Sequence, residues 1–109
     1  MFFSFPKDFL TRELLPEVSQ HVAWGERMML CFTTLKPDAL VPLHNHPHEQ
    51  LSVVIEGELT LTIGETTRLM RPRDAAFIPS DVEHSAAAGS CGSVVIDVFS
   101  PPREDYKTV

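Results

Sequence analysis

Residues 44–50, which read His-Asn-His-Pro-His-Glu-Gln, contain the side chains best suited to chemistry in this sequence. Side chains two positions apart leave the same face of an extended chain, so His44 and His46 point the same way on a β-strand. A strand that continues to Gln50 keeps its amide on that face. His84 arrives from a distant segment and supplies a third imidazole. The sequence therefore predicts one metal site with His44, His46, Gln50 and His84 as ligands.

These four predicted ligands are all electrically neutral. A divalent metal held by them keeps nearly its full charge, which favours anionic substrates and Lewis-acid action and weighs against oxygen chemistry. We expect one divalent ion, nickel, zinc, iron or manganese, because imidazole ligands suit several metals. Two alternatives stay open: the histidines could belong to a polar surface loop, or the protein could have kept them without the metal.

Two further residues of this segment could also approach the metal. His48 could be a substitute ligand or could support one of the ligands. Glu49 is adjacent to Gln50, and neighbouring strand residues face opposite sides, so we expect Glu49 to point away from the interior.

A second candidate group lies near the C-terminal end of the chain. The run Val94–Phe99 is typical of a buried strand, yet it contains Asp97, and a buried charge is costly unless it is paired or hydrogen-bonded. Asp97 and Phe99 share one face of such a strand. Two prolines follow and could hold Arg103 at a defined place near the end of the strand. The alternative is that Asp97 caps a turn or pairs with Arg103 on the surface.

The elements that must position these groups are short strands separated by turns. Strands at such spacing indicate an all-β sandwich or barrel. Helix evidence is thin, although Asp8–Val18 could hold a turn or two before Pro16 limits it. The expected strands are Arg27–Leu35, Gln50–Ile55, Glu58–Ile63, Ala75–Ile78 and Ser93–Phe99, and turns are expected at Glu56-Gly57 and Ala88-Gly89-Ser90.

Length and charge narrow the possible functions. A chain of 109 residues is expected to form a single domain, residues 1–109. A formal net charge of −6 argues against nucleic acid or an anionic membrane as a partner. Cys31 and Cys91 form no paired motif and are expected to be free thiols, as in a reducing compartment. The N-terminus lacks the basic region of a signal peptide, so we expect a cytoplasmic location.

Residues 1–25 are rich in aromatic side chains and are expected to pack on the barrel or on a partner subunit. Exposed phenylalanines form the kind of apolar patch that is usually covered. This segment is the reason to expect a homodimer.

The spacing of these residues resembles that of the cupin barrels over about residues 35–103. Cupins have a first motif G-x5-H-x-H-x3,4-E-x6-G and a second motif G-x5-P-x-G-x2-H-x3-N. The resemblance implies an all-β cupin fold, a double-stranded β-helix or jelly-roll barrel. The matching residues are His44, His46, Gln50, Gly57, Pro79 and His84, and the departures are Gln50 for glutamate, Asp38, Arg73 and Asp81 for glycines, and Ala88 for asparagine.

Residues 44–50, together with the closing sequence DVFSPPREDY at residues 97–106, resemble the KdgF family of small cupins. That family acts in pectin and alginate breakdown and opens 4,5-unsaturated monouronates into linear 4-deoxy-5-keto-uronates. The resemblance implies a metal-dependent ring-opening enzyme with a small anionic sugar acid as its partner. It implies metal ligands at His44, His46, Gln50 and His84, and other functional residues at Asp97, Phe99 and Arg103.

On this interpretation each of the last three residues has a chemical role. Asp97 is the candidate proton shuttle, Arg103 is suited to gripping a carboxylate, and Phe99 offers an apolar wall to the sugar. Three other interpretations stay open: a small metal-dependent dioxygenase, a non-catalytic cupin that binds a sugar acid, and a dimeric scaffold without a working site.

Overall fold

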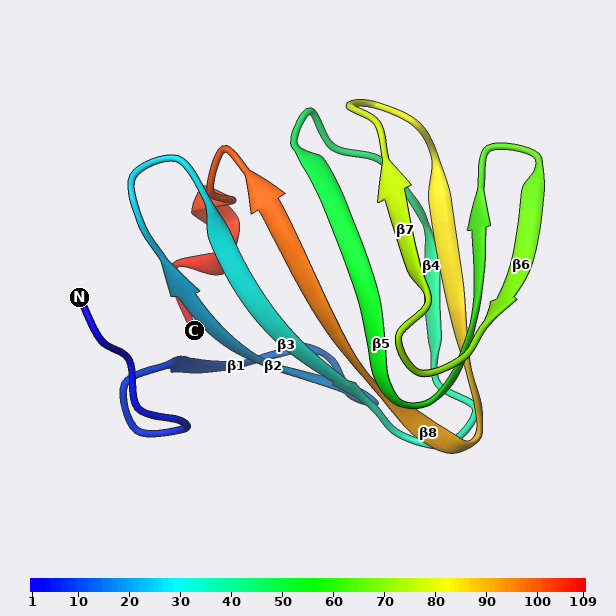
Figure 1. Cartoon of the computed structure of the whole chain (residues 1–109), viewed down its shortest axis with the longest axis horizontal. Coiled ribbons are helices and arrows are strands. Elements are labelled where there is room, and N and C mark those ends of the chain that lie inside the picture. Colours follow the sequence, from blue (N-terminus) through cyan, green and yellow to red (C-terminus); the bar gives the residue numbers. More distant parts are fainter.

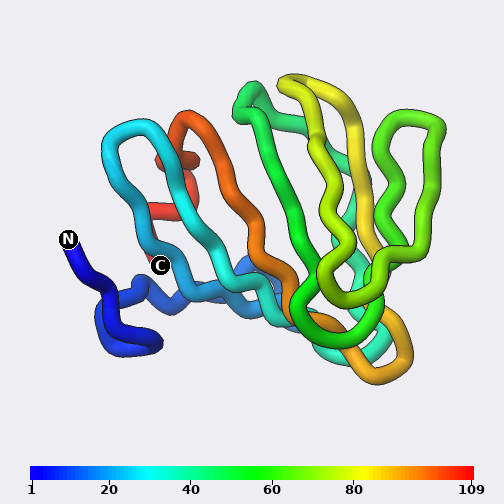
Figure 2. Tube along the Cα trace, viewed as in Figure 1, coloured from blue at the N-terminus to red at the C-terminus, as the bar shows by residue number.

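The computed structural model describes all 109 residues and contains eight β-strands and one short 3-10 helix (Figures 1 and 2). No helix is long and apolar enough to cross a membrane. The elements in chain order are β1 (Leu10–Leu15), β2 (Val18–Trp24), β3 (Met29–Leu35), β4 (Leu40–His44), β5 (Glu49–Ile63), β6 (Thr66–Met70), β7 (Ala75–Ile78), β8 (His84–Ser100) and η1 (Glu104–Tyr106).

The strands form two facing layers that share β5 and β8. In one layer the order is β1-β2-β3, then the C-terminal part of β8, the N-terminal part of β5, and β7. In the other layer β4 pairs with the start of β8, which pairs with the end of β5, and β6 follows. Figure 1 shows the two layers as the arms of a V. The predicted all-β cupin barrel is confirmed.

The two long strands bend where one layer passes into the other. The ladder between β5 and β8 shifts register on both sides of Gly57, and a straight 17-residue strand would span about 55 Å, longer than the 36 Å axis of the molecule. Gly57 and Gly92 have φ of 72° and 78° and lie against each other at the bend. A Cβ on Gly57 would lie 2.1 Å from the carbonyl oxygen of Gly92. The bend therefore needs glycine at position 57.

Several expected boundaries differ from the structure. The turn predicted at Glu56-Gly57 is a bulge inside β5, and the turn predicted at Ala88-Gly89-Ser90 lies inside β8. In both cases pairing between the long strands continues through residues with turn propensity. The helical turns considered within Asp8–Val18 are wrong: Leu10–Leu15 is strand β1, whose register with β2 pairs Leu10 with Val22.

Three non-glycine residues keep the left-handed backbone of the glycines they replace. Asp38, Arg73 and Asp81 have φ of 60°, 78° and 64°. Each occupies a position where the cupin motifs have glycine. The loops therefore keep their shape in spite of the substitutions, at a cost that is largest for Arg73, because aspartate tolerates this region better than arginine does.

The apolar interior divides into two clusters. The larger lies between the layers around Val54, Ile78 and Val95, and the smaller packs Met29, Cys31, Phe99 and Tyr106 together. Cys31 and Cys91 are both free thiols.

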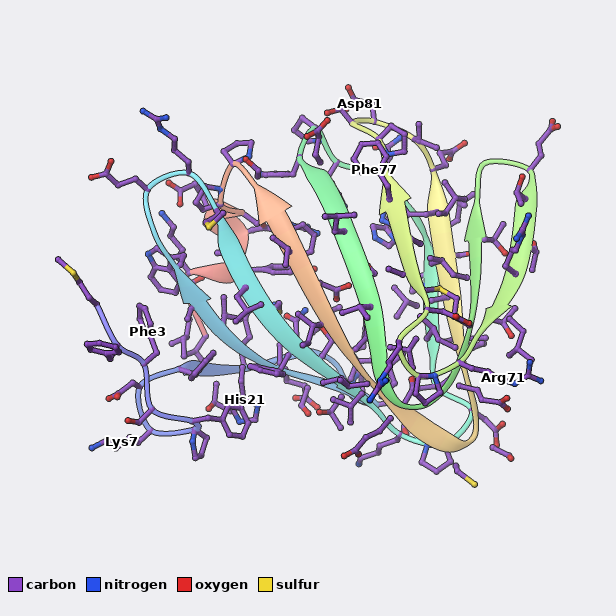
Figure 3. All side chains as sticks on the ribbon, viewed as in Figure 1. Phe3, Lys7, His21, Arg71, Phe77 and Asp81 are labelled. Carbon is purple, nitrogen blue, oxygen red and sulfur yellow. The ribbon has the colours of Figure 1, made fainter.

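The aromatic N-terminal segment lies against the outer face of the first layer. The Phe5 ring is 5.2 Å from that of Phe32 and 4.9 Å from that of His21, and Phe9 also contacts Phe32. Phe3, Lys7 and His21 lie at the end of the molecule remote from Phe77 and Asp81 (Figure 3).

Candidate metal centre

Three histidines converge in the barrel interior. His44 ends β4 and His84 begins β8, and the two residues are directly paired in the ladder between these strands. His46 lies in the loop between β4 and β5, so the single strand expected to run from His44 to Gln50 is wrong: the chain leaves β4 at His44 and enters β5 at Glu49. One nitrogen of each ring lies within 4.8 Å of the others, close enough for one metal ion to bind all three.

Backbone carbonyls determine which nitrogen of each ring is available. Each Nδ1 lies within hydrogen-bond distance of a carbonyl oxygen two residues away: 2.7 Å for His44, 3.1 Å for His46 and 2.9 Å for His84. A carbonyl can only accept, so each Nδ1 carries the proton and each Nε2 presents a lone pair. This is the tautomer that binds a metal through Nε2.

The lone pair of His84 is buried without a partner. Its Nε2 makes no hydrogen bond. Burial lowers the pKa of His84 from 6.5 to about 4, and burial followed by the charge of Arg103 lowers the pKa of His46. The rings of His46 and His84 are therefore neutral near pH 7. A buried acceptor without a donor is costly, and a metal ion would satisfy it.

Gln50 connects the histidines to the other end of the pocket. Its Nε2 donates to Ser52 Oγ at 2.9 Å and to Asp97 Oδ1 at 3.1 Å, which turns Oε1 toward His46 Nε2 at 3.0 Å. Because His46 Nδ1 already uses the ring proton, both of these facing atoms are acceptors. Two lone pairs at this distance repel each other unless a cation is near them. The residues therefore fit a divalent ion held by His44, His46, Gln50 and His84.

Asp97 lies in the middle strand of the first layer, between β3 and β5. Its Oδ1 accepts hydrogen bonds from Ser52 at 2.6 Å and from Gln50, and its Oδ2 accepts one from Thr33 at 2.8 Å. Burial raises the pKa of Asp97, while these three hydrogen bonds and the charge of Arg103 lower it. The alternative of a turn cap or a surface ion pair with Arg103 is not the arrangement in the structure.

Arg103 follows the two prolines and returns to the pocket. Its Nε and Nη2 donate to the carboxylate of Asp105 at 3.3 and 2.9 Å, and its guanidinium carbon lies 3.9 Å from the ring centroid of Tyr106 and 5.3 Å from that of Phe99. Its side chain is only 12% exposed. Asp105 thus occupies one edge of the guanidinium and leaves Nη1 for a ligand.

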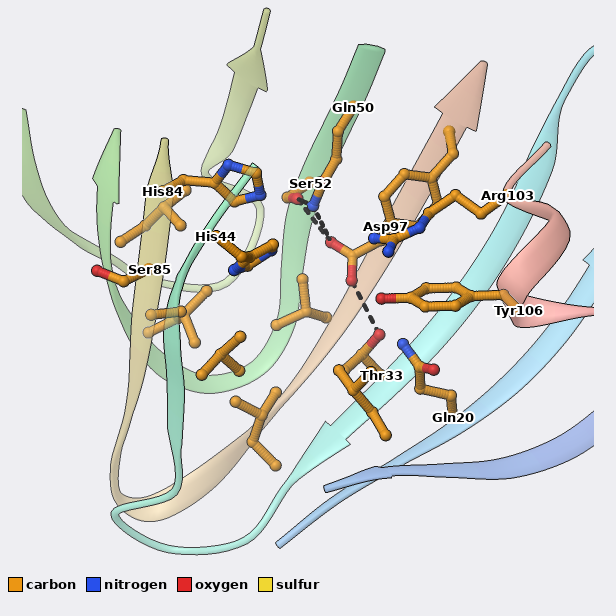
Figure 4. Close-up of a pocket in the computed structure, with 18 residues that line it drawn as sticks. Gln20, Thr33, His44, Gln50, Ser52, His84, Ser85, Asp97, Arg103 and Tyr106 are labelled. Atoms are coloured by element: carbon orange, nitrogen blue, oxygen red, sulfur yellow. Dashed lines mark hydrogen bonds between the residues drawn. The ribbon is translucent and has the colours of Figure 1, made fainter. Parts of the chain in front are cut away.

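Most of these groups line one pocket of about 530 Å³, a volume that includes the open space at its mouth, whereas His46 does not line it although its ring belongs to the histidine cluster (Figure 4). Three further predicted residues also line it: Asp97, Phe99 and Arg103, and the Phe99 ring lies 5.6 Å from that of His46. Ser52 could have been found from the sequence, since it lies two residues after Gln50 on the same strand face. Further polar lining residues that the sequence reasoning missed are Gln20, Thr33 and Tyr106, which come from other segments.

The two doubtful residues of the histidine segment lie outside this pocket. The His48 ring is 5.5 Å from that of His46, but it is absent from the three-histidine cluster and from the pocket lining. Glu49 is exposed, as expected from its place beside Gln50.

Comparison with known families matches residues 31–99 to the cupin domain. The chain belongs to the cupin family. The motif spacing that suggested the family is thus supported by a match to more than half of the chain, and this family usually places a metal among histidines of its barrel.

Individual relatives include proteins named KdgF. The chain is 28% identical over 86 residues to the pectin degradation protein KdgF of Dickeya dadantii. The matched segment covers 78% of each protein. The structure of KdgF from Halomonas sp. superposes with a TM-score of 0.89 at 26% identity, over 97% of this chain and 98% of that one. This cupin is therefore similar to KdgF in sequence and in its whole fold.

A shorter similarity links the cupin to a protein named H2HPP isomerase from Bacillus subtilis. The two are 39% identical over 51 residues, which are 46% of this chain and 22% of the relative. The chain thus matches only a small part of that protein.

Proposed function

We propose that this cupin is a metal-dependent enzyme that opens the ring of 4,5-unsaturated monouronates to give linear 4-deoxy-5-keto-uronates. The similarity to KdgF supports the substrate class. The observation that carries the proposal is the position of Gln50, whose oxygen faces the histidines and whose nitrogen binds Asp97. A substrate at the metal would therefore lie beside a buried carboxyl.

The bound metal would supply Lewis-acid polarisation of the substrate's carboxylate and ring oxygen. It would be held by His44, His46, Gln50 and His84. The neutral ligand set leaves the charge of the ion available to an anionic sugar acid. This attraction operates in spite of the net negative charge of the whole chain.

Asp97 is the proton carrier in this proposal. In the overall reaction the C1 hydroxyl loses a proton, the bond from C1 to the ring oxygen breaks, and C4 gains a proton, so no net proton is consumed. A carboxyl whose pKa is raised by burial holds a proton more readily than a free carboxyl does, and this suits it to carry a proton to or from the sugar. The hydrogen bonds from Ser52 and Thr33 keep its two oxygens at fixed positions.

Arg103 and Phe99 bind the sugar in this proposal. The free Nη1 end of Arg103 donates to an oxygen of the anionic substrate, and the pair with Asp105 holds the guanidinium in place. Phe99 is 2% exposed and lines the pocket, so it contributes an apolar surface without competing hydrogen bonds.

The absorbance of the enol ether in an unsaturated monouronate tests this function. Metal-loaded protein should accelerate the loss of that band over the spontaneous rate, and a chelator or Asp97→Asn should abolish the acceleration. Oxygen consumption with bound iron would instead support the dioxygenase. Tight binding of the sugar acid with no acceleration at all would support the non-catalytic cupin.

We also propose that the protein is a cytoplasmic homodimer that associates through the outer face of the first layer. Leu30, Val98, Leu51 and Phe77 are paired in one row across four strands, and Leu51 and Phe77 are 52% and 50% exposed. An apolar face of this kind is usually covered. Light scattering should give a dimer for the native protein and a monomer for the double substitution Leu51→Asp, Phe77→Asp. A monomeric native protein would refute the dimer.

A further inference from the structure

The end of the pocket remote from the histidines has polar groups that the proposed function leaves unused. Gln20 and Tyr106 line this end and are 1% and 5% exposed (Figure 4). The hydroxyl of Tyr106 points toward the side of Asp97 and Thr33 (Figure 4). Buried polar groups at a pocket wall are suited to selecting among ligands.

The ring of Tyr106 is fixed by its neighbours. The guanidinium carbons of Arg103 and Arg12 lie 3.9 and 4.6 Å from the ring centroid, and the Phe99 ring meets it at 5.6 Å and an interplanar angle of 89°. These contacts use the ring alone. They remain when the hydroxyl is removed, so a phenylalanine fits the same place.

Arg12 determines which atoms donate and which accept hydrogen bonds at this end of the pocket. Its Nη1 donates to Gln20 Oε1 at 2.6 Å, and arginine can only donate. The Gln20 amide is therefore oriented with its oxygen toward Arg12 and its nitrogen toward Tyr106. Burial raises the pKa of Tyr106, whereas the charge of Arg103 and the Gln20 amide lower it. The Tyr106 hydroxyl has both a proton to donate and lone pairs to accept, so it can donate to a ligand while the Gln20 nitrogen lies on its other side.

We propose that Tyr106 donates a hydrogen bond to the C2 hydroxyl of the unsaturated monouronate and so determines which C2 epimer is preferred. This inference rests on the proposed function. The C5 carboxylate then lies at the histidines, and C2 lies across the six-membered ring, at the end lined by Tyr106. The pectin-derived and alginate-derived sugars are epimers at C2, so one donor at this place distinguishes them. Gln20 and Arg12 are positioning residues.

The test compares native protein with Tyr106→Phe on both epimers, with kcat and KM determined separately. Loss of one neutral hydrogen bond should raise KM roughly 3- to 10-fold for the preferred epimer, with little change for the other. Gln20→Met should give a smaller change in KM for the same epimer. Lys107→Met alters the same C-terminal segment outside the pocket and should change neither value.

The outcomes separate this inference from the function on which it rests. If native protein opens a monouronate but Tyr106→Phe changes both epimers equally, the assignment of Tyr106 is wrong and the function stands. If metal-loaded native protein accelerates neither epimer, the function is wrong and this inference fails with it. The thermal midpoint of each variant shows that a change in KM does not come from unfolding.

Discussion

The two ends of the pocket hold their polar groups in different ways. At the histidine end, each Nδ1 is oriented by a backbone carbonyl only two residues away. At the carboxyl end, Asp97 is held by side chains of β3 and β5 that are 45 to 64 residues distant in sequence. Local orientation survives changes elsewhere in the barrel, whereas orientation by distant side chains depends on the register of three strands. The three histidines should therefore keep their orientation when Asp97 is changed, whereas the orientation of Gln50 depends on its hydrogen bonds to Ser52 and Asp97.

The largest expected effect comes from breaking the histidine end. His84→Ala removes one of the four proposed ligands. Loss of a residue that only supports a ligand costs roughly 10- to 100-fold in metal affinity, and loss of a ligand should cost more. Ring opening should fall to the spontaneous rate. Metal content after dialysis measures the first effect and the enol ether absorbance the second. His21→Ala removes a histidine outside the site and should leave both unchanged. Full metal content in His84→Ala would contradict the assigned ligand set.

The matching change at the carboxyl end should separate chemistry from metal binding. Asp97→Asn keeps the shape of the side chain but cannot carry the proton, so kcat should fall on the order of 10²- to 10⁴-fold. Metal content should match that of the native protein, because the histidines keep their local anchors and the asparagine oxygen can still accept the hydrogen bond from Gln50. Loss of metal together with activity would show that the two ends are not independent.

Acid should reduce the free energy of unfolding of the metal-free protein, because His84 is harder to protonate in the folded state than in the unfolded state. The folded-state pKa of His84 is about 4 against 6.5 for the free side chain, so the unfolded chain binds more protons between these values. The free energy of unfolding should thus decrease as the pH falls from 6.5 to 4, by up to about 3 kcal/mol. The raised pKa of Asp97 acts in the opposite sense, because the folded state there holds the proton more tightly.

Urea unfolding of metal-free protein across this pH range measures the dependence. The decrease should be smaller in His84→Asn, which cannot titrate, and steeper in Asp97→Asn, which removes the opposing group. An identical pH dependence in all three proteins would show that neither residue contributes.

A smaller effect is expected when the hydrogen bond from Thr33 of β3 to Asp97 is removed. Thr33→Val removes the donor to Oδ2 and should reduce the free energy of unfolding by about 1–3 kcal/mol, with a smaller loss of kcat than Asp97→Asn. Thr34 is the next residue of β3 but is exposed, so Thr34→Val provides the control. Equal effects of the two substitutions would mean that the loss comes from strand propensity.

The difference between the two ends also explains how much the sequence could predict. The grouping of His44, His46, Gln50 and His84 was predicted from a recognised motif, although the single strand expected to hold the first three is interrupted between β4 and β5. The candidate role of Asp97 followed from its charge in an apolar strand, but its partner Thr33 did not, because pairing of β3 with β8 is a long-range choice. Tyr106 follows two prolines and a turn and gave no periodic signal. The strands β1 and β2 were missed because Thr11 and Glu13 suit a helix start and Pro16 lies between the two strands, and β6 was not expected either.

The smallest expected effect concerns the replaced glycines. Arg73 has φ of 78°, so Arg73→Gly should relieve backbone strain and increase the free energy of unfolding by about 0.5–1 kcal/mol, without changing kcat. Arg73→Ala loses the same side chain but keeps a Cβ and should give no such gain. Thermal unfolding of both variants measures the difference, and equal midpoints would show that strain at Arg73 is negligible.

The bend at Gly57 and Gly92 determines the distance between His84 and Asp97 in the pocket. His84 and Asp97 belong to the same strand, thirteen residues apart, and straight pairing would separate them by about 43 Å. They face one pocket only because β8 folds back through the bend together with β5. The separation of metal and acid is thus a property of a folded ribbon, not of flexible loops. Gly57 and Gly92 lie outside the pocket, yet a side chain at either position would collide with nearby backbone and so disturb the separation of His84 and Asp97.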